Sequence, residues 1–127
     1  MKEFVIHGNV ISKKNSRVIN FKLKRSFPSA AYTKWHEAAV AELLLQKQGF
    51  TTEKCKIVMK FFYGDLVRRD IDNGTSSVFD TLVDAGILLD DNWKVVNKLM
   101  VESEYDKGNA RCVIQIYEPS EVIEYYF

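Results

Sequence analysis

The chain lacks long apolar runs: no hydrophobic stretch approaches the roughly 20 residues needed to cross a bilayer. Its first residues alternate and include the acidic Glu3, which is unlike a secretory signal. Repeats, linkers and low-complexity tracts are also absent from the 127 residues. We therefore expect one soluble domain, residues 1–127, that works in the cytoplasm without a membrane.

Cysteine and histidine are scarce, with two of each. Cys55 and Cys112 lie in apolar, strand-like stretches, where cysteine usually behaves as a small buried hydrophobe. Neither has a second Cys or His at metal-ligand spacing, so a zinc site is not expected, while a single disulfide between them stays open. His7 and His36 have no acid or nucleophile spaced for a catalytic dyad. We interpret both as structural or surface residues.

The formal net charge is only +1, but the two halves of the chain differ strongly. Residues 1–60 hold 12 Lys and Arg against 4 Asp and Glu, whereas residues 61–127 hold 6 against 13. The first half could therefore bind a polyanion while the second half supplies carboxylates. The alternative is that these charges simply intermix once the chain folds.

Hydrophobic periodicity predicts an α+β fold, a two-layer domain with a mixed β-sheet and two helices. Strands are expected at residues 3–11, 54–63, 95–105 and 110–118, the last two as a hairpin around residues 106–109. The polar, basic segment 12–26 is interpreted as a loop or open ribbon. The tail from residue 119 to residue 127 has no assignment.

The first helix is expected to begin at or just after Ser29, to reach about Gln48 and to be stopped by Gly49. Asn73 is predicted to cap a second helix that ends at Gly86. Residues at helical spacing are expected to face the core: Tyr32, Trp35, Ala39 and Leu43 in the first helix, and Val78, Leu82 and Ala85 in the second. Tyr32 and Trp35 could instead stack on bases, but the core interpretation is favoured.

Two carboxylates stand two residues apart, at Asp70 and Asp72, just before the second helix. In an extended chain both would point to the same side. Like charges held together favour a cation between them, and an oxygen-only ligand set suits Mg²⁺ or Mn²⁺. A second acidic pair, Asp90 and Asp91, follows the helix and would approach the first only if the loop folds back.

Other interpretations of this motif stay open. Asp-x-Asp-Asn-Gly before a helix is also common turn chemistry with a capping residue. A calcium-binding EF-hand loop is not expected, because Thr75 occupies the position that requires Gly and Thr81 the position that requires Glu. Asp80 and Asp84 lie four residues apart on the predicted helix, which usually marks a solvated face.

Several separated motifs agree in order and spacing. Residues 68–73 read Arg-Arg-Asp-Ile-Asp-Asn, residues 80–82 read Asp-Thr-Leu, and Asp90-Asp91 precedes a predicted strand. Together they resemble the RusA family of Holliday-junction resolvases, the crossover junction endodeoxyribonucleases. The similarity is close over residues 68–96 and looser earlier, where Ser12, Asn15 and Arg17 are similar to the family's Ser–Asn–Arg loop and Ser29 with Tyr32 to its helix start.

This resemblance implies a homodimeric nuclease that binds four-way DNA junctions in recombination and repair and nicks two opposed strands. Asp70, Asp72 and Asp91 occupy the positions of the family's essential carboxylates, so they are the expected catalytic residues and ligands of Mg²⁺, with Mn²⁺ as a substitute. A two-fold axis would supply two active sites for paired incisions. The residues expected to contact DNA are Lys13, Lys14, Asn15, Arg17, Lys22, Lys24, Arg25, Arg68 and Arg69.

One position departs from the family pattern. The family has a catalytic lysine three residues after the Asn of Asp-x-Asp-Asn, and here that position is Ser76. A lysine could neutralise charge on the scissile phosphate, which a serine cannot. Arg69, Lys94 or Lys98 could supply that charge. The alternative is a junction-binding protein of the same fold that cuts slowly or not at all.

Overall fold

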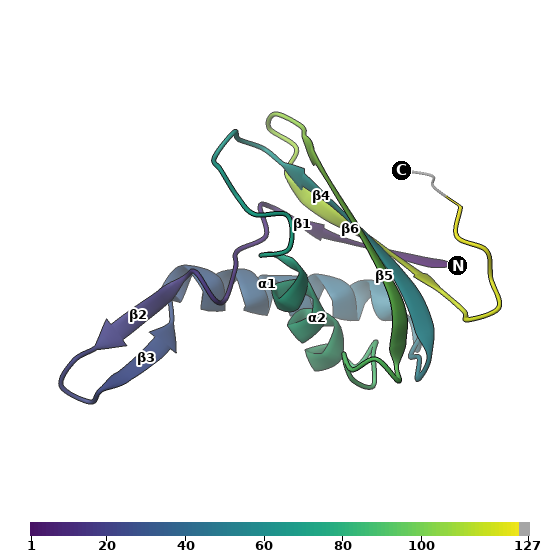
Figure 1. Cartoon of the computed structure of the whole chain (residues 1–127), viewed down its shortest axis with the longest axis horizontal. Coiled ribbons are helices and arrows are strands. Elements are labelled where there is room, and N and C mark those ends of the chain that lie inside the picture. The colour runs from purple at the N-terminus through teal and green to yellow at the C-terminus, as the bar shows by residue number, and fades with distance from the viewer. Residues whose placement is uncertain (125–127) are drawn as a thin grey trace.

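The computed structural model describes residues 1–124, which form the predicted α+β fold (Figure 1). A four-stranded mixed sheet, a separate two-stranded ribbon and two helices make up the domain. In chain order the elements are β1 (Lys2–His7), β2 (Arg17–Asn20), β3 (Arg25–Pro28), α1 (Ala30–Lys47), β4 (Cys55–Tyr63), α2 (Thr75–Asp84), β5 (Val96–Tyr105) and β6 (Arg111–Tyr117). Within the described part of the chain, no helix is long and apolar enough to span a membrane.

The strand order in the main sheet is β1-β6-β4-β5. The predicted hairpin of residues 95–105 and 110–118 is wrong, because β4 lies between β5 and β6 and pairs with both. β4 is parallel to β5, with α2 on the connection between them, and antiparallel to β6. The turn after β5 crosses the end of β4, where the amide of Asp106 donates to the carbonyl of Tyr63 at 2.9 Å. Burial of β4 on both faces favours this interior position.

The structure changes two of the predicted segments and confirms a third. β1 ends at His7 and not at residue 11, because Gly8 turns the chain with a φ of 90°. The segment predicted as a loop or open ribbon forms the β2–β3 ribbon, which extends to Pro28. α1 lies where predicted: the Ser29 side chain accepts the amide of Tyr32 at 3.1 Å, and Gln48 and Gly49 end the helix with positive φ values.

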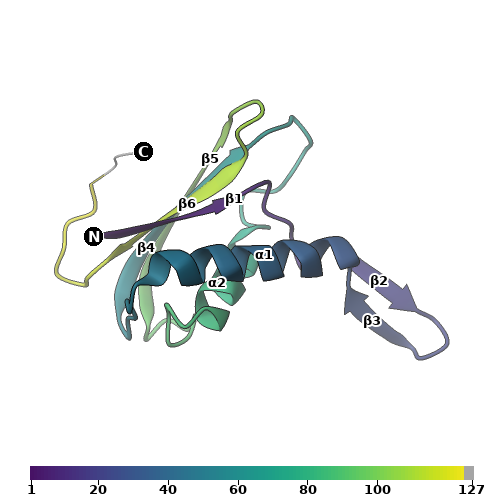
Figure 2. The same ribbon diagram turned by 180° about the vertical axis from the view of Figure 1, so that it is seen from behind.

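Both helices pack on one face of the main sheet, and the core lies between these two layers (Figures 1 and 2). The predicted core residues of both helices are buried there, as are Phe4 and Ile6 of β1. Cys55 and Cys112 are buried free thiols, so the disulfide that the sequence left open is not formed. Burial raises the pKa of the Cys55 thiol to about 11.

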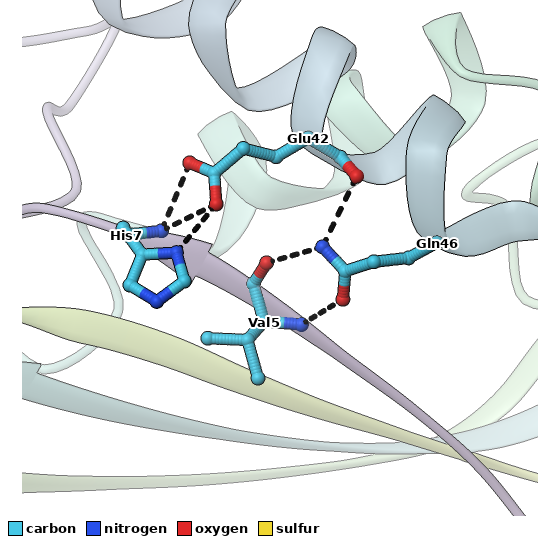
Figure 3. A network of polar contacts seen from close by, with 4 residues as sticks. All are labelled: Val5, His7, Glu42 and Gln46. Atoms are coloured by element: carbon cyan, nitrogen blue, oxygen red, sulfur yellow. Dashed lines mark hydrogen bonds and ion pairs between the residues drawn. The ribbon is translucent and has the colours of Figure 1, made fainter.

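α1 also protects the exposed edge of the sheet (Figure 3). β1 is an edge strand, so half of its backbone groups have no strand partner. The Gln46 amide accepts from the backbone nitrogen of Val5 at 2.8 Å and donates to its carbonyl at 2.7 Å. The Glu42 carboxylate accepts from the backbone nitrogen of His7 at 3.2 Å and contacts its ring. His7 therefore has a structural role, as predicted.

Candidate active site

Asp70 and Asp72 lie on the segment between β4 and α2, but that segment is not extended throughout. The amide of Asn73 donates to the carbonyl of Asp70 at 3.2 Å, which closes a turn before the helix. The predicted extended geometry is therefore wrong at Asp72. Asn73 does not cap the helix either. The N-cap residue is Gly74, which has no side chain that could accept a capping hydrogen bond. Instead, the Thr75 hydroxyl donates to the carbonyl of Asp72 at 2.7 Å and fixes the backbone there.

Gly74 sets the distance between this turn and the sheet. A Cβ atom at Gly74 would lie 2.7 Å from Cε1 of Phe61 and 3.3 Å from Cγ1 of Val10. Phe61 is buried in the core, where close packing limits how far its ring can shift. Glycine therefore lets the turn that carries Asp70 and Asp72 lie directly on β4.

The side chains of Asp70 and Asp72 are exposed, and within residues 1–124 neither makes a hydrogen bond or ion pair. Carboxylate oxygens that no protein group occupies are free to bind a cation. Their oxygens suit Mg²⁺, which proteins commonly hold through one or two carboxylates, with water and substrate phosphate completing its shell. The chemistry of this pair therefore fits a magnesium ion.

A polar network holds the start of the carboxylate segment. Asp65 accepts two bonds from the Arg69 guanidinium, at 2.7 and 3.2 Å, and one from Asn9 at 3.0 Å. The Arg69 guanidinium also lies over the Tyr63 ring, 4.4 Å from its centroid. The bond from Arg69 is the largest cause that holds the pKa of the Asp65 carboxyl below its ordinary value. Arg69 is thus committed to positioning the segment that ends at Asp70.

Two clefts flank this segment, and Arg68 and Arg69 line both of them. The first, of about 360 Å³, lies between residues 65–71 and the end of β5, with Asp70 in its wall. The second, of about 280 Å³, lies between residues 9–15 and the helix start, with Asn15 and Asn73 in its wall. The early basic loop and the carboxylate segment therefore share a surface, although they are more than 50 residues apart in sequence.

The second acidic pair has a different environment. The amide of Asp91 donates to the Asp90 carboxylate at 2.7 Å, and this bond is the largest cause that lowers the pKa of Asp90. Burial raises the pKa of Asp91, as do the neighbouring charges of Asp90 and Asp80. Asp80, interpreted from sequence as part of a solvated face, therefore belongs to the surroundings of Asp91.

Among residues 1–124, no three Asp, Glu, His or Cys side chains gather in a group that could hold a metal ion. The structure thus places Asp70 and Asp72 at one turn and Asp91 next to Asp90, with the charge of Asp80 near enough to raise the pKa of Asp91. The shared ligand set of Asp70, Asp72 and Asp91 stays a prediction.

Lys13 links the basic loop to α2. Its backbone nitrogen donates to the buried Ser77 hydroxyl at 3.0 Å, and its ammonium contacts Asp80 at 3.5 Å. The ammonium also lies 5.9 Å from the centroid of the Tyr32 ring. Lys13 therefore places a positive charge next to the first turns of α2, which contain Ser76. No periodicity in the sequence indicates this contact, because 64 residues separate Lys13 from Ser77.

The three basic residues considered as substitutes for the family lysine have different environments. Arg69 is held by Asp65, Lys94 lies over the Trp93 ring at 5.9 Å, and Lys98 is an exposed residue of the edge strand β5. The predicted DNA-contacting residues Lys14, Asn15, Arg17, Lys22, Lys24, Arg25 and Arg68 are all exposed. Arg17 also donates to the Ser26 hydroxyl at 3.1 Å.

Across residues 1–124, the α+β domain thus carries two exposed carboxylates without a protein partner and an exposed basic loop. The family model described as Endodeoxyribonuclease RusA matches residues 7–117, which include both acidic pairs, the basic loop and the whole main sheet except residues 2–6 of β1. The chain belongs to the RusA endodeoxyribonuclease family, as its sequence motifs predicted. Family membership implies Holliday-junction resolvase activity. No curated protein matches the chain.

Proposed function

We propose that this protein is a magnesium-dependent endodeoxyribonuclease that resolves four-way DNA junctions by paired, symmetric nicks in recombination and repair. The observation that carries the proposal is the family match over residues 7–117, which spans a turn with two exposed, unpartnered carboxylates. The adjoining clefts, lined by Arg68, support DNA as the substrate. The proposed site of action is the cytoplasm.

Asp70 and Asp72 would hold Mg²⁺ from the turn before α2, and Asp91 would complete the site from beyond the helix. When bound, this ion supplies the positive charge that polarises a phosphate and lowers the pKa of a bound water. The Asp65–Arg69 network keeps Asp70 in position by fixing the preceding residues. Arg68, exposed between two clefts, would bind a phosphate of the strand to be cut.

Lys13 is our candidate for the charge that the family places at the position of Ser76. Its backbone is tied to the same helical turn through Ser77, and its ammonium lies within reach of Asp80. Once DNA is bound, this ammonium could neutralise charge that develops on the phosphate. A lysine contributed by the early loop would thus replace one contributed by the helix.

A homodimer is part of the proposal, because symmetric incision of two opposed strands requires two sites related by a two-fold axis. Binding affinity would come mostly from the basic residues of the early loop and ribbon, which neutralise DNA phosphates. The affinity should therefore fall steeply as salt concentration rises.

A cleavage assay on a synthetic four-way junction tests the proposal. In Mg²⁺ the parent protein should produce paired nicks, whereas Asp72→Asn should bind the junction and leave it intact. Asp84→Asn is the matched control, because Asp84 is an exposed helical carboxylate whose partner is His36, outside the proposed site. Cleavage by Asp72→Asn at the parent rate would contradict the metal assignment.

The second candidate function is junction binding without cleavage, and Ser76 favours it because the family's lysine is absent there. The same assay separates the two functions. A shifted junction band with no nicked product across a range of Mg²⁺ and Mn²⁺ concentrations would support a binding protein and exclude the nuclease.

A further inference from the structure

The β2–β3 ribbon projects from the domain beyond the beginning of α1, away from the main sheet (Figures 1 and 2). Large apolar side chains are nevertheless exposed along it: Val18, Ile19, Phe21, Leu23 and Phe27. Val18 lies opposite Phe27 in the ribbon, and Phe21 and Leu23 lie in the turn at its end. Exposed large apolar side chains gathered on one small element indicate an interaction site in a soluble protein. The most exposed of these residues is Phe21 at the tip, with 84% of its surface accessible.

The tip is ordered in a way that presents Phe21. Asn20 pairs with Arg25, which leaves four residues to make the turn. The Asn20 side chain accepts the amide of Leu23 at 3.0 Å, and Lys24 closes the turn with a positive φ of 51°. The backbone that carries Phe21 is therefore a defined turn, which lowers the ordering entropy lost when the tip binds a partner.

The base of the ribbon is fixed to the domain. The amide of Ser29, the residue that caps α1, donates to the carbonyl of Ser16 at 2.8 Å, and the hydroxyls of these two serines are in contact. The five residues from Arg17 to Phe21 span roughly 15 Å at the rise of a β-strand, which exceeds the depth of either DNA groove. The ribbon is thus an anchored arm long enough to reach the bases.

Charge indicates what this arm contacts. Arg17, Lys22, Lys24 and Arg25 surround the apolar tip, and the sequence has no acidic residue between Glu3 and Glu37. A second copy of the arm would bring like charges together, because a two-fold contact pairs a surface with itself. A nucleic acid can bind both kinds of side chain, because its phosphates pair with the basic residues and its bases stack on the Phe21 ring.

We propose that the β2–β3 ribbon is a wedge arm that inserts Phe21 between bases at the centre of a four-way DNA junction, while Lys22 and Lys24 bind the flanking phosphates. Apolar side chains on basic elements unstack DNA in this way in other architectures. Unstacking one base step costs a few kcal/mol, and phosphate contacts made by the basic residues of the arm would offset that cost. This inference rests on the proposed junction binding and adds how the junction is held open.

The test is permanganate oxidation of thymines at the crossover of a synthetic junction, with EDTA present so that no strand is cut. Parent protein should increase the reactivity of those thymines, because unstacking exposes them. Phe21→Ala should remove the increase and weaken binding by roughly tenfold, the loss of one base–aromatic stack. Phe21→Tyr should retain both, because it keeps the ring.

Two comparisons make the result specific. Leu45→Ala removes a side chain that is 83% exposed on α1, and it should change neither reactivity nor affinity. Lys22→Ala should lower the slope of log affinity against log salt by roughly one, whereas Phe21→Ala should leave that slope unchanged. Sedimentation of parent and Phe21→Ala then reports whether the arm joins two copies.

Each alternative result has a distinct meaning. Junction binding by the parent without increased thymine reactivity, or an increase retained by Phe21→Ala, would overturn the wedge arm and leave the proposed function standing. Conversion of a dimer to a monomer by Phe21→Ala would assign the ribbon to a subunit interface and also overturn it. Absence of any junction binding by the parent would remove the proposed function, and the wedge arm with it.

Discussion

The backbone nitrogen of Lys13 donates to the hydroxyl of Ser77 across 3.0 Å, and this bond fixes the basic loop to the first turns of α2. Ser77 is fully buried, so its hydroxyl oxygen would lose this hydrogen-bond donor if the loop moved away. The bond holds Lys13 next to Asp80 and leaves Lys14 exposed to solvent. Two adjacent lysines thus have different environments, and we expect different consequences when each is replaced.

Lys13→Gln should slow single-turnover junction cleavage by about 100-fold, the typical effect of removing one preorganised charge stabiliser. The substitution keeps the backbone bond to Ser77, so the loop should stay in place. Lys13→Arg should recover part of the rate because it restores the charge. Lys14→Gln is the matched control and should alter mainly affinity. Equal slowing by the Lys13 and Lys14 substitutions would show that Lys13 acts only as a general DNA contact.

Gly74→Ala should destabilise the protein by about 1–3 kcal/mol, because the new methyl group would overlap the buried Phe61 ring. Thermal denaturation should show a decrease in Tm of roughly 4–15 °C. The double variant Gly74→Ala with Phe61→Leu should lose less stability than the two single effects predict, since the smaller side chain leaves room for the methyl group. Additive effects in the double variant would contradict the close approach.

Asp65→Asn should remove a pH-dependent part of the stability. The folded-state pKa of Asp65 is lowered by Arg69, so its contribution is present above the unfolded pKa of about 4 and is lost as pH falls through the lower folded value. The parent should therefore exceed Asp65→Asn in stability at neutral pH, and the difference should shrink below about pH 4. Urea denaturation at a series of pH values measures this. A difference independent of pH would indicate that the Arg69 ion pair contributes nothing.

The sequence alone was sufficient for the elements whose pattern is local. Tyr32, Trp35, Ala39 and Leu43 are buried on α1 as their helical spacing predicted, and Ser29 caps that helix. The family was also predicted from sequence, because the Asp-x-Asp-Asn and Asp-Asp motifs lie in one continuous stretch. Such signals depend on neighbours a few residues apart, which the order of amino acids specifies directly.

Strand pairing was decided by the tertiary structure. The pattern of residues 95–118 fits a hairpin as well as it fits two strands separated by a third, because alternation fixes only which face each side chain takes. Placing β4 between β5 and β6 buries both faces of the most apolar strand. That gain comes from residues more than 30 positions away, so no local pattern could reveal it.

The candidate site divides in the same way. Sequence determined that acidic and basic residues of the right kinds are present, since Asp70, Asp72 and the basic loop are visible as motifs. Only the tertiary structure decided that Lys13 reaches Ser77 and Asp80 of α2, and that the charge of Asp80 acts on Asp91. The physical reason is that electrostatic partners are chosen by distance in space, and folding brings together charges that are far apart along the chain.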